Sequence, residues 1–226
     1  MDTEAENPKP RCNIRRIIDI FLILLATLYV ITLISPMVIR SGSDRSGIRE
    51  TVFNARRIGL ALMEFENEYG AFPNEETRVL VEKKHGTAIP LEGKSSNALF
   101  RQLFAAGFTQ SEAMFYTKSQ GKRKPDGNIT LGELLKKGEV GFGYIAGLSM
   151  DGNPARPIVF CPIIPGTDRF DPKPFDGKAV ILRLDNSATT LVIDKNGHAF
   201  SGGSNILSPD NPVWKGKAPD IRYPEI

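Results

Sequence analysis

The chain has 226 residues, which is enough for one ordinary domain and an additional segment. Its hydrophobic fraction of 41% and charged fraction of 24% exclude a wholly disordered protein. The formal net charge of +3 is too small for a dedicated nucleic-acid-binding protein, so no nucleic-acid partner is predicted. Two histidines and two cysteines offer few ligands for a metal cluster, and 21 glycines with 16 prolines indicate a body rich in turns.

Residues 17–39 form the most hydrophobic stretch of the sequence. Residues 20–39 carry no charge and, as a helix rising ~1.5 Å per residue, are about as long as the hydrocarbon core of a bilayer is thick. No small-residue cleavage site follows them. The pattern predicts an uncleaved transmembrane helix over 17–39, preceded by a cytoplasmic segment over 1–16 and followed by an extracytoplasmic domain over 40–226. Basic residues before the stretch favour a cytoplasmic N-terminus.

An amphipathic helix is predicted next, because apolar residues recur at steps of three and four. Gly70 and Pro73 are suited to end it. We expect its apolar side to be a helix-packing face, formed by Ile48, Val52, Ala55, Gly59, Leu62, Phe65 and Tyr69.

Shorter elements follow. Two helices are predicted over 74–84 and 97–106, and Thr109 with Glu112 has the spacing of a capping box. Strands are predicted over 140–148, 158–164, 178–184 and 189–193, with a further edge strand near 198–200 and an irregular tail over the last 25 residues. The pattern predicts an α+β fold in which the helix packs on a small antiparallel sheet.

Three features resemble type IV pilin-like proteins, closest to the pseudopilins of type II secretion systems. The first is the helix and helix exit over residues 54–62 and 68–73. The second is the spacing between Asp19 and Pro36, and the third is the pair of segments 177–182 and 194–197. The resemblance implies a pilin-like fold, with a long N-terminal helix that is half in the membrane and half on the sheet.

The same resemblance implies a function and a location. The chain is expected to be a structural subunit of a type II secretion pseudopilus or a type IV pilus-like assembly, acting through helix–helix packing in protein secretion. Its expected partners are related pilin-like subunits, an inner-membrane assembly platform and the lipid bilayer. Its expected location is a bacterial inner membrane, as a single-pass protein with a periplasmic C-terminal domain.

One departure from the family concerns the N-terminus. The glycine and phenylalanine of the prepilin peptidase site are missing from residues 13–19, which removes the processed amine that the family's acidic residue contacts. For Asp19, three alternatives stay open: an ion pair with Arg15 or Arg16, a contact between subunits, or exposure at the interface.

Residues with catalytic or metal-binding chemistry are few. His85, His198 and the segment 201–204 lack an activating constellation, so no enzymatic activity and no small-molecule substrate are predicted. No cofactor is expected, with one exception: a calcium-stabilised loop of major pseudopilins is similar to the segment that holds Asp168, Asp171 and Asp176. The alternative for these aspartates is turn formation and ion pairing.

Two other classes of function compete with the structural subunit. The first is a membrane-tethered extracytoplasmic binding or sensor module that has a pilin-like body and does not polymerise, which the missing cleavage glycine favours. The second is a periplasmic enzyme on an anchor, which a polar cleft with convergent titratable groups would favour.

Overall fold

The computed structural model describes residues 14–86, 88–118, 123–130, 132 and 134–226. The chain divides into two units, Met1–Ser43 and Asp44–Ile226, which are described separately below. Helix α1, Ile14–Tyr69, contributes residues to both units. Within α1, side chains are described for residues 18–31 and 47–69. The predicted cytoplasmic segment 1–16 lies almost entirely outside the described residues.

The transmembrane helix predicted for residues 17–39 is wrong. Among the residues that the structure describes, no helix is long and apolar enough to cross a membrane. The predicted location, a single-pass inner-membrane protein with its C-terminal domain in the periplasm, is corrected by the same finding.

The second unit contains a five-stranded antiparallel sheet in the order β4-β3-β2-β1-β7. Its strands are β1 Gly143–Ala146, β2 Pro157–Cys161, β3 Lys178–Arg183, β4 Ala188–Val192 and β7 Asp220–Arg222. A two-stranded sheet joins β5 Phe200–Ser201 to β6 Ser204–Asn205. The unit is thus α+β with an antiparallel sheet, as predicted.

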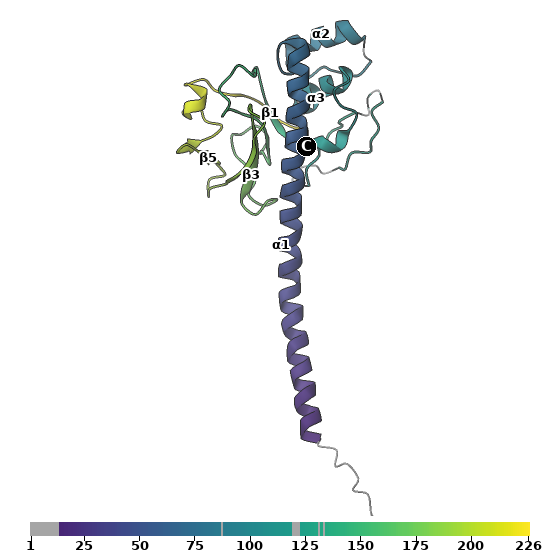
Figure 1. Cartoon of the computed structure of the whole chain (residues 1–226), viewed down its shortest axis with the longest axis vertical. Helices are drawn as coiled ribbons and strands as arrows, with labels where there is room; N and C mark the ends of the chain where they lie inside the picture. The colour runs from purple at the N-terminus through teal and green to yellow at the C-terminus, as the bar shows by residue number, and fades with distance from the viewer. Residues whose placement is uncertain (1–13, 87, 119–122, 131, 133) are drawn as a thin grey trace, which may run out of the picture. The chain divides into compact units, whose positions relative to one another are not determined.

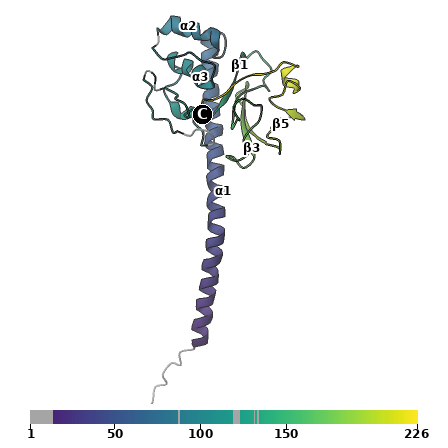
Figure 2. The same cartoon turned by 180° about the vertical axis from the view of Figure 1, so that it is seen from behind.

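Helices α2 Glu75–His85 and α3 Ser96–Ala105 and the 3₁₀ helix η1 Glu112–Phe115 lie on the opposite side of α1 from the sheet (Figures 1 and 2). A second 3₁₀ helix, η2 Pro212–Trp214, lies on the side of the sheet. The second part of α1 is therefore covered on two sides, by strands and by α3.

Both faces of the three central strands β1, β2 and β3 are buried, which explains why these strands read as apolar runs rather than as clean alternations. Along β1, Tyr144 and Ala146 join the core that contains α1 and α3, whereas Ile145 joins a second core on the other face. The second core is covered by a loop that carries Phe170 and by the short 3₁₀ helix η2, which carries Trp214, rather than by an α-helix. The sheet therefore separates a helical layer from a loop layer.

Helices α2 and α3 confirm the two short helices that the sequence predicts. Asn74 caps α2 through hydrogen bonds that its side chain accepts from the N–H groups of Glu76 and Thr77, and Gly86 ends it in the left-handed conformation. Ser95 caps α3 by accepting a hydrogen bond from the Ala98 N–H. These signals are local, so the sequence alone reveals them.

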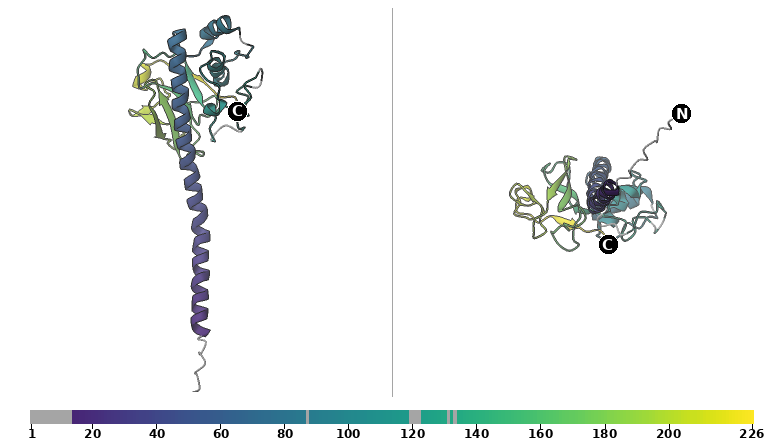
Figure 3. Two further views of the ribbon diagram at one scale, coloured as in Figure 1. Left: turned by 45° about the vertical axis from the view of Figure 1, so that its right-hand side comes forward. Right: turned by 90° about the horizontal axis from the view of Figure 1, so that it is seen from below.

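The C-terminal tail and the Thr109 cap differ from prediction. The tail was expected to be irregular, but β7 pairs with β1 through Ile145↔Ile221 and forms one edge of the sheet (Figure 3). The Thr109 hydroxyl accepts a hydrogen bond from the Ser111 N–H at 3.2 Å instead of joining Glu112 in a capping box. Glu112 is turned inward and is buried.

Candidate functional site

The described part of the first unit presents an apolar surface on helix α1, here called the apolar segment and defined as residues 18–31. Its large side chains are between 49% and 64% exposed, and they point to all sides of the helix because they occupy nearly every position. They are Ile18, Ile20, Phe21, Leu22, Ile23, Leu24, Leu25, Leu28, Tyr29, Val30 and Ile31. Thr27 satisfies its own hydroxyl by donating to the Leu24 carbonyl at 2.9 Å.

Asp19 is exposed on this apolar segment and is its one charged residue. The side chains of Arg15 and Pro36, which the sequence links to Asp19, lie outside the described residues. The three alternatives for Asp19, a local ion pair, an intersubunit contact or exposure at the interface, therefore stay predictions.

The helix-packing face predicted for the second part of α1 lies against the sheet and α3. Leu62 and Phe65 are fully buried in the helical core, and Ile48, Val52 and Tyr69 pack at its edge. Gly59 marks the closest approach, since a Cβ there would overlap Asn186 Oδ1 and lie 3.0 Å from Leu182 Cδ2. The face thus fixes α1 to the body of its own unit.

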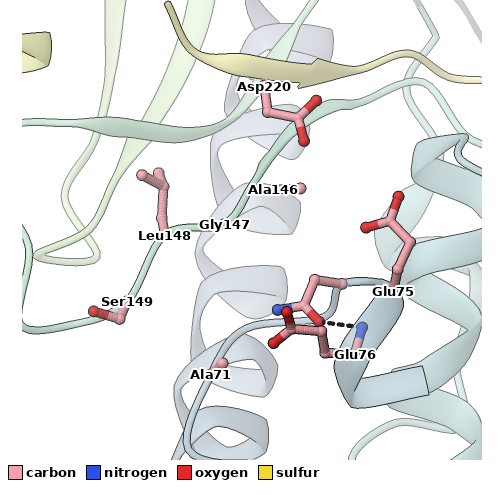
Figure 4. A pocket seen from close by; sticks show the side chains of 9 residues that line it. Ala71, Glu75, Glu76, Ala146, Gly147, Leu148, Ser149 and Asp220 are labelled. Carbon is pink, nitrogen blue, oxygen red and sulfur yellow. Dashed lines mark hydrogen bonds between the residues drawn. The ribbon is translucent and has the colours of Figure 1, made fainter. Parts of the chain in front are cut away.

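A cleft of about 410 Å³ lies between the start of α2, strand β7 and the segment after β1 (Figure 4). Glu75 and Glu76 reach it from the first turn of α2, and Asp220 reaches it from β7. The segment after β1, including Leu148 and Ser149, forms the opposite wall. The sequence analysis missed this cleft because it joins a helix N-terminus to the tail that was expected to be irregular.

Arg222 organises the carboxylates of this cleft. Its Nη1 lies 2.7 Å from Glu75 Oε1, and its Nη2 lies 2.6 Å from Asp220 Oδ2. The Glu76 carboxylate is exposed and takes part in neither of these two contacts. Arg222 thus compensates the charge of two of the three carboxylates that line the cleft.

A buried carboxylate, Glu66, lies on α1 close to the segment that forms this wall. Both of its oxygens accept from the Met150 N–H, at 2.8 and 3.0 Å. Burial raises the pKa of Glu66, the Met150 hydrogen bond opposes that change, and the charge of Asp151 raises the pKa further. Glu66 therefore holds the segment after β1 against α1.

The structure gives the three loop aspartates different partners. Asp168 Oδ2 accepts from the Asn205 amide at 2.8 Å, and Asp171 Oδ1 accepts from the Lys173 N–H at 3.0 Å. Asp176 occupies a turn with φ of 51°. Within the described ranges, no three carboxylate, histidine or cysteine side chains form a group that could hold a metal ion.

Removing divalent cations is expected to leave the stability of the protein unchanged. Asp168 and Asp171 already accept hydrogen bonds from protein groups, and Asp176 lies in a turn. These three side chains are therefore not arranged as the ligands of a calcium ion. Thermal melts of the full chain with excess chelator and with millimolar calcium should coincide. A melting temperature that rises with calcium concentration would restore the calcium loop, since a ligand that binds the folded state stabilises it.

The two histidines have partners that do not activate a nucleophile. His85 Nε2 lies 2.7 Å from Tyr69 Oη, and burial together with the charge of Glu68 raises the pKa of Tyr69 to about 12. The phenol therefore stays protonated at neutral pH. His198 Nε2 lies 3.8 Å from Asp168 Oδ2, at the edge of ion-pair distance.

Comparison with known proteins does not assign the chain to a group. No family model, no curated protein and no solved structure matches it. The pilin-like resemblance therefore depends on the residues described in the sequence analysis alone.

Proposed function

We propose that this protein is a structural subunit that packs its apolar segment against the same segment of neighbouring copies, in a fibre-like assembly of the kind that pilins and pseudopilins form. The observation that carries the proposal is the exposure of residues 18–31 on every side of the helix. Burying each large apolar side chain is worth about 1.5–3 kcal/mol, so association that covers these side chains is strongly favourable.

Copies of the same segment suit this surface for a geometrical reason. A helix with one apolar stripe can be covered by a single groove, whereas a helix that is apolar all round needs neighbours on several sides. Each additional copy brings one such helix and covers a further side of its neighbours, so the association is not limited to a pair. The single charge, Asp19, stays near one end of the segment.

The fold of the second unit is compatible with this proposal. Ala55, Ile58, Leu62 and Phe65 of α1 are buried in the core beside an antiparallel sheet, so a force on the helix is transmitted to the whole unit. The sequence resemblance adds the finer interpretation that we propose, a pilin-like arrangement in which one long N-terminal helix serves both as a packing element and as the spine of the folded body.

Introducing charge into the apolar segment is expected to weaken assembly strongly. The double variant Leu24→Glu and Leu28→Glu places two carboxylates on one side of the helix, and burying an unpaired charge costs more than the apolar contact gains. Sedimentation of the full-length wild-type chain should show large species, and the variant should require at least about tenfold higher concentration to form them.

The matched control is Val192→Glu, which adds a charge at an apolar position that is 73% exposed on β4. This variant should assemble like the wild type. A wild-type chain that stays monomeric at every concentration contradicts the proposal and favours the alternative of a binding module that does not polymerise.

A further inference from the structure

The connection between η1 and β1 carries a motif that belongs neither to the core nor to the cleft. It is Asn128-Ile129-Thr130, here called the acceptor triplet, and it is the only place in the sequence where serine or threonine stands two positions after an asparagine. This spacing, without a proline between the two residues, is the pattern that N-linked glycosylation requires. Because so short a pattern also arises by chance, its surroundings decide whether it can serve as an acceptor.

The acceptor triplet is open to solvent. Asn128, Ile129 and Thr130 are all exposed, and Ile129 is 41% exposed although it is large and apolar. The adjacent Asp126 and Gly127 are exposed as well. The triplet belongs to no helix or strand, so an enzyme can bind its backbone without breaking a hydrogen-bonded element. A transferase can therefore reach this segment in the folded protein.

The two polar side chains of the triplet form an Asx turn. Thr130 Oγ1 donates a hydrogen bond to Asn128 Oδ1 at 2.6 Å, and the Thr130 N–H donates to the same oxygen at 3.2 Å. Both donors draw electron density toward the carboxamide oxygen, which makes the Nδ2 protons more acidic. Within the described part of the chain no contact engages Asn128 Nδ2, so this nitrogen is free to form a new bond.

The base of this turn is fixed by other groups. The Gly127 N–H donates to the buried carboxylate of Glu112 at 3.0 Å. Asp126 Oδ1 accepts from the Asn128 N–H at 2.9 Å, and Asp126 Oδ2 lies 3.1 Å from Lys136 Nζ. These anchors use backbone groups and neighbouring side chains rather than the side chains of the triplet. The triplet is therefore presented to solvent on a fixed base.

We propose that Asn128 is an N-glycosylation site, modified by a transferase whose donor is a lipid-linked oligosaccharide diphosphate. In the transfer, Asn128 Nδ2 forms a bond to the anomeric carbon of the first sugar, and the bond from that carbon to the diphosphate oxygen breaks. The lipid diphosphate leaves with the electron pair of the broken bond, and one Nδ2 proton passes to a base of the transferase. No group is oxidised or reduced. This inference is independent of the proposed function, so either can fail while the other stands.

A glycan at Asn128 changes the surface around it. An attached oligosaccharide is bulky and solubilising, and it covers the exposed side chain of Ile129. The modification therefore keeps this part of the second unit out of contacts with other proteins.

Mass spectrometry of the full-length chain, purified from the cells that make it, tests the proposal. Trypsin releases the whole triplet in one peptide, residues 124–136, because a lysine that precedes proline is not cut. This peptide should carry an oligosaccharide, and electron-transfer fragmentation should place the sugar on Asn128. A bare peptide overturns the proposal, and so does a sugar placed on Thr130.

Matched substitutions, expressed in the same cells, distinguish an acceptor from a turn that is only structural. Asn128→Asp keeps an oxygen for the Asx turn but has no side-chain nitrogen, so the glycan should be lost and the chain should migrate faster on a denaturing gel. Thr130→Ser keeps the hydroxyl and should stay modified, whereas Thr130→Val keeps the shape without the hydroxyl and should lose the glycan. Circular dichroism verifies that the variants fold. Equal modification of the serine and valine variants, or a glycan that persists in Asn128→Asp, contradicts the assignment of Asn128.

Discussion

Replacing Phe65 by alanine is expected to lower the free energy of unfolding by about 3–5 kcal/mol, the range measured for large aromatic side chains in cores. Phe65 is fully buried on α1, its ring stacks on Tyr69 with centroids 4.5 Å apart, and it meets the Phe108 ring edge-on at 5.9 Å. Because ordinary domains are stable by about 5–15 kcal/mol, the loss removes a large part of the total. Urea unfolding followed by circular dichroism measures it.

Phe53→Ala is the matched control, since the same residue type is removed from the same helix at a position that is 61% exposed. Its cost in the monomeric unit should be a few tenths of a kcal/mol. Equal costs for the two variants would mean that α1 does not pack on the sheet and α3 as described.

The elements that the sequence predicts well are those whose signals are local. The caps at Asn74 and Gly86 place α2 within one or two residues of its observed ends, because a capping hydrogen bond involves neighbours in the chain. The apolar period of α1 identifies Leu62 and Phe65 as core residues for the same reason.

The features that the sequence does not predict depend on distant partners. Strand β7 is three residues long and is stabilised by pairing with β1, for example through Tyr144↔Arg222, so its own sequence carries little strand signal. The acidic cleft follows from that pairing, since Asp220 comes to α2 only when β7 is in place. The transmembrane prediction failed differently, because an apolar composition indicates that a surface is to be buried and does not identify what buries it.

Glu112 illustrates a polar residue whose role sequence reasoning missed. The sequence suggests a capping residue, but its carboxylate is 1% exposed and accepts two backbone hydrogen bonds, from the Leu135 N–H at 2.8 Å and the Gly127 N–H at 3.0 Å. Each of its oxygens therefore holds a different point of the loop that follows η1. No local sequence pattern reveals these two contacts, because the N–H groups lie 15 and 23 residues further along the chain.

Glu112→Gln is expected to cost about 2–3 kcal/mol near neutral pH, because the amide can accept one of the two backbone hydrogen bonds and must present its own N–H groups to the other. Glu66→Gln is the matched control. Both oxygens of Glu66 accept from a single N–H, that of Met150, so a glutamine keeps the contact through its carbonyl oxygen. The control variant should unfold within about 0.5 kcal/mol of the wild type. Equal losses for the two variants would contradict the assigned hydrogen bonds.

The pH dependence of the Glu112 variant has a defined sign. Burial raises the pKa of Glu112 above 4.5, the Leu135 hydrogen bond opposes the change, and the charges of Glu139 and Asp126 raise the pKa further. The folded state therefore binds this proton more tightly than the unfolded state. The resulting stabilisation is complete below the unfolded pKa and is lost as the pH rises through the folded pKa. Glutamine does not titrate, so the difference in unfolding free energy between wild type and Glu112→Gln should be larger at pH 4.5 than near pH 8. Urea titrations at the two pH values measure it, and a difference that grows with pH would show that the folded protein favours the charged form of Glu112.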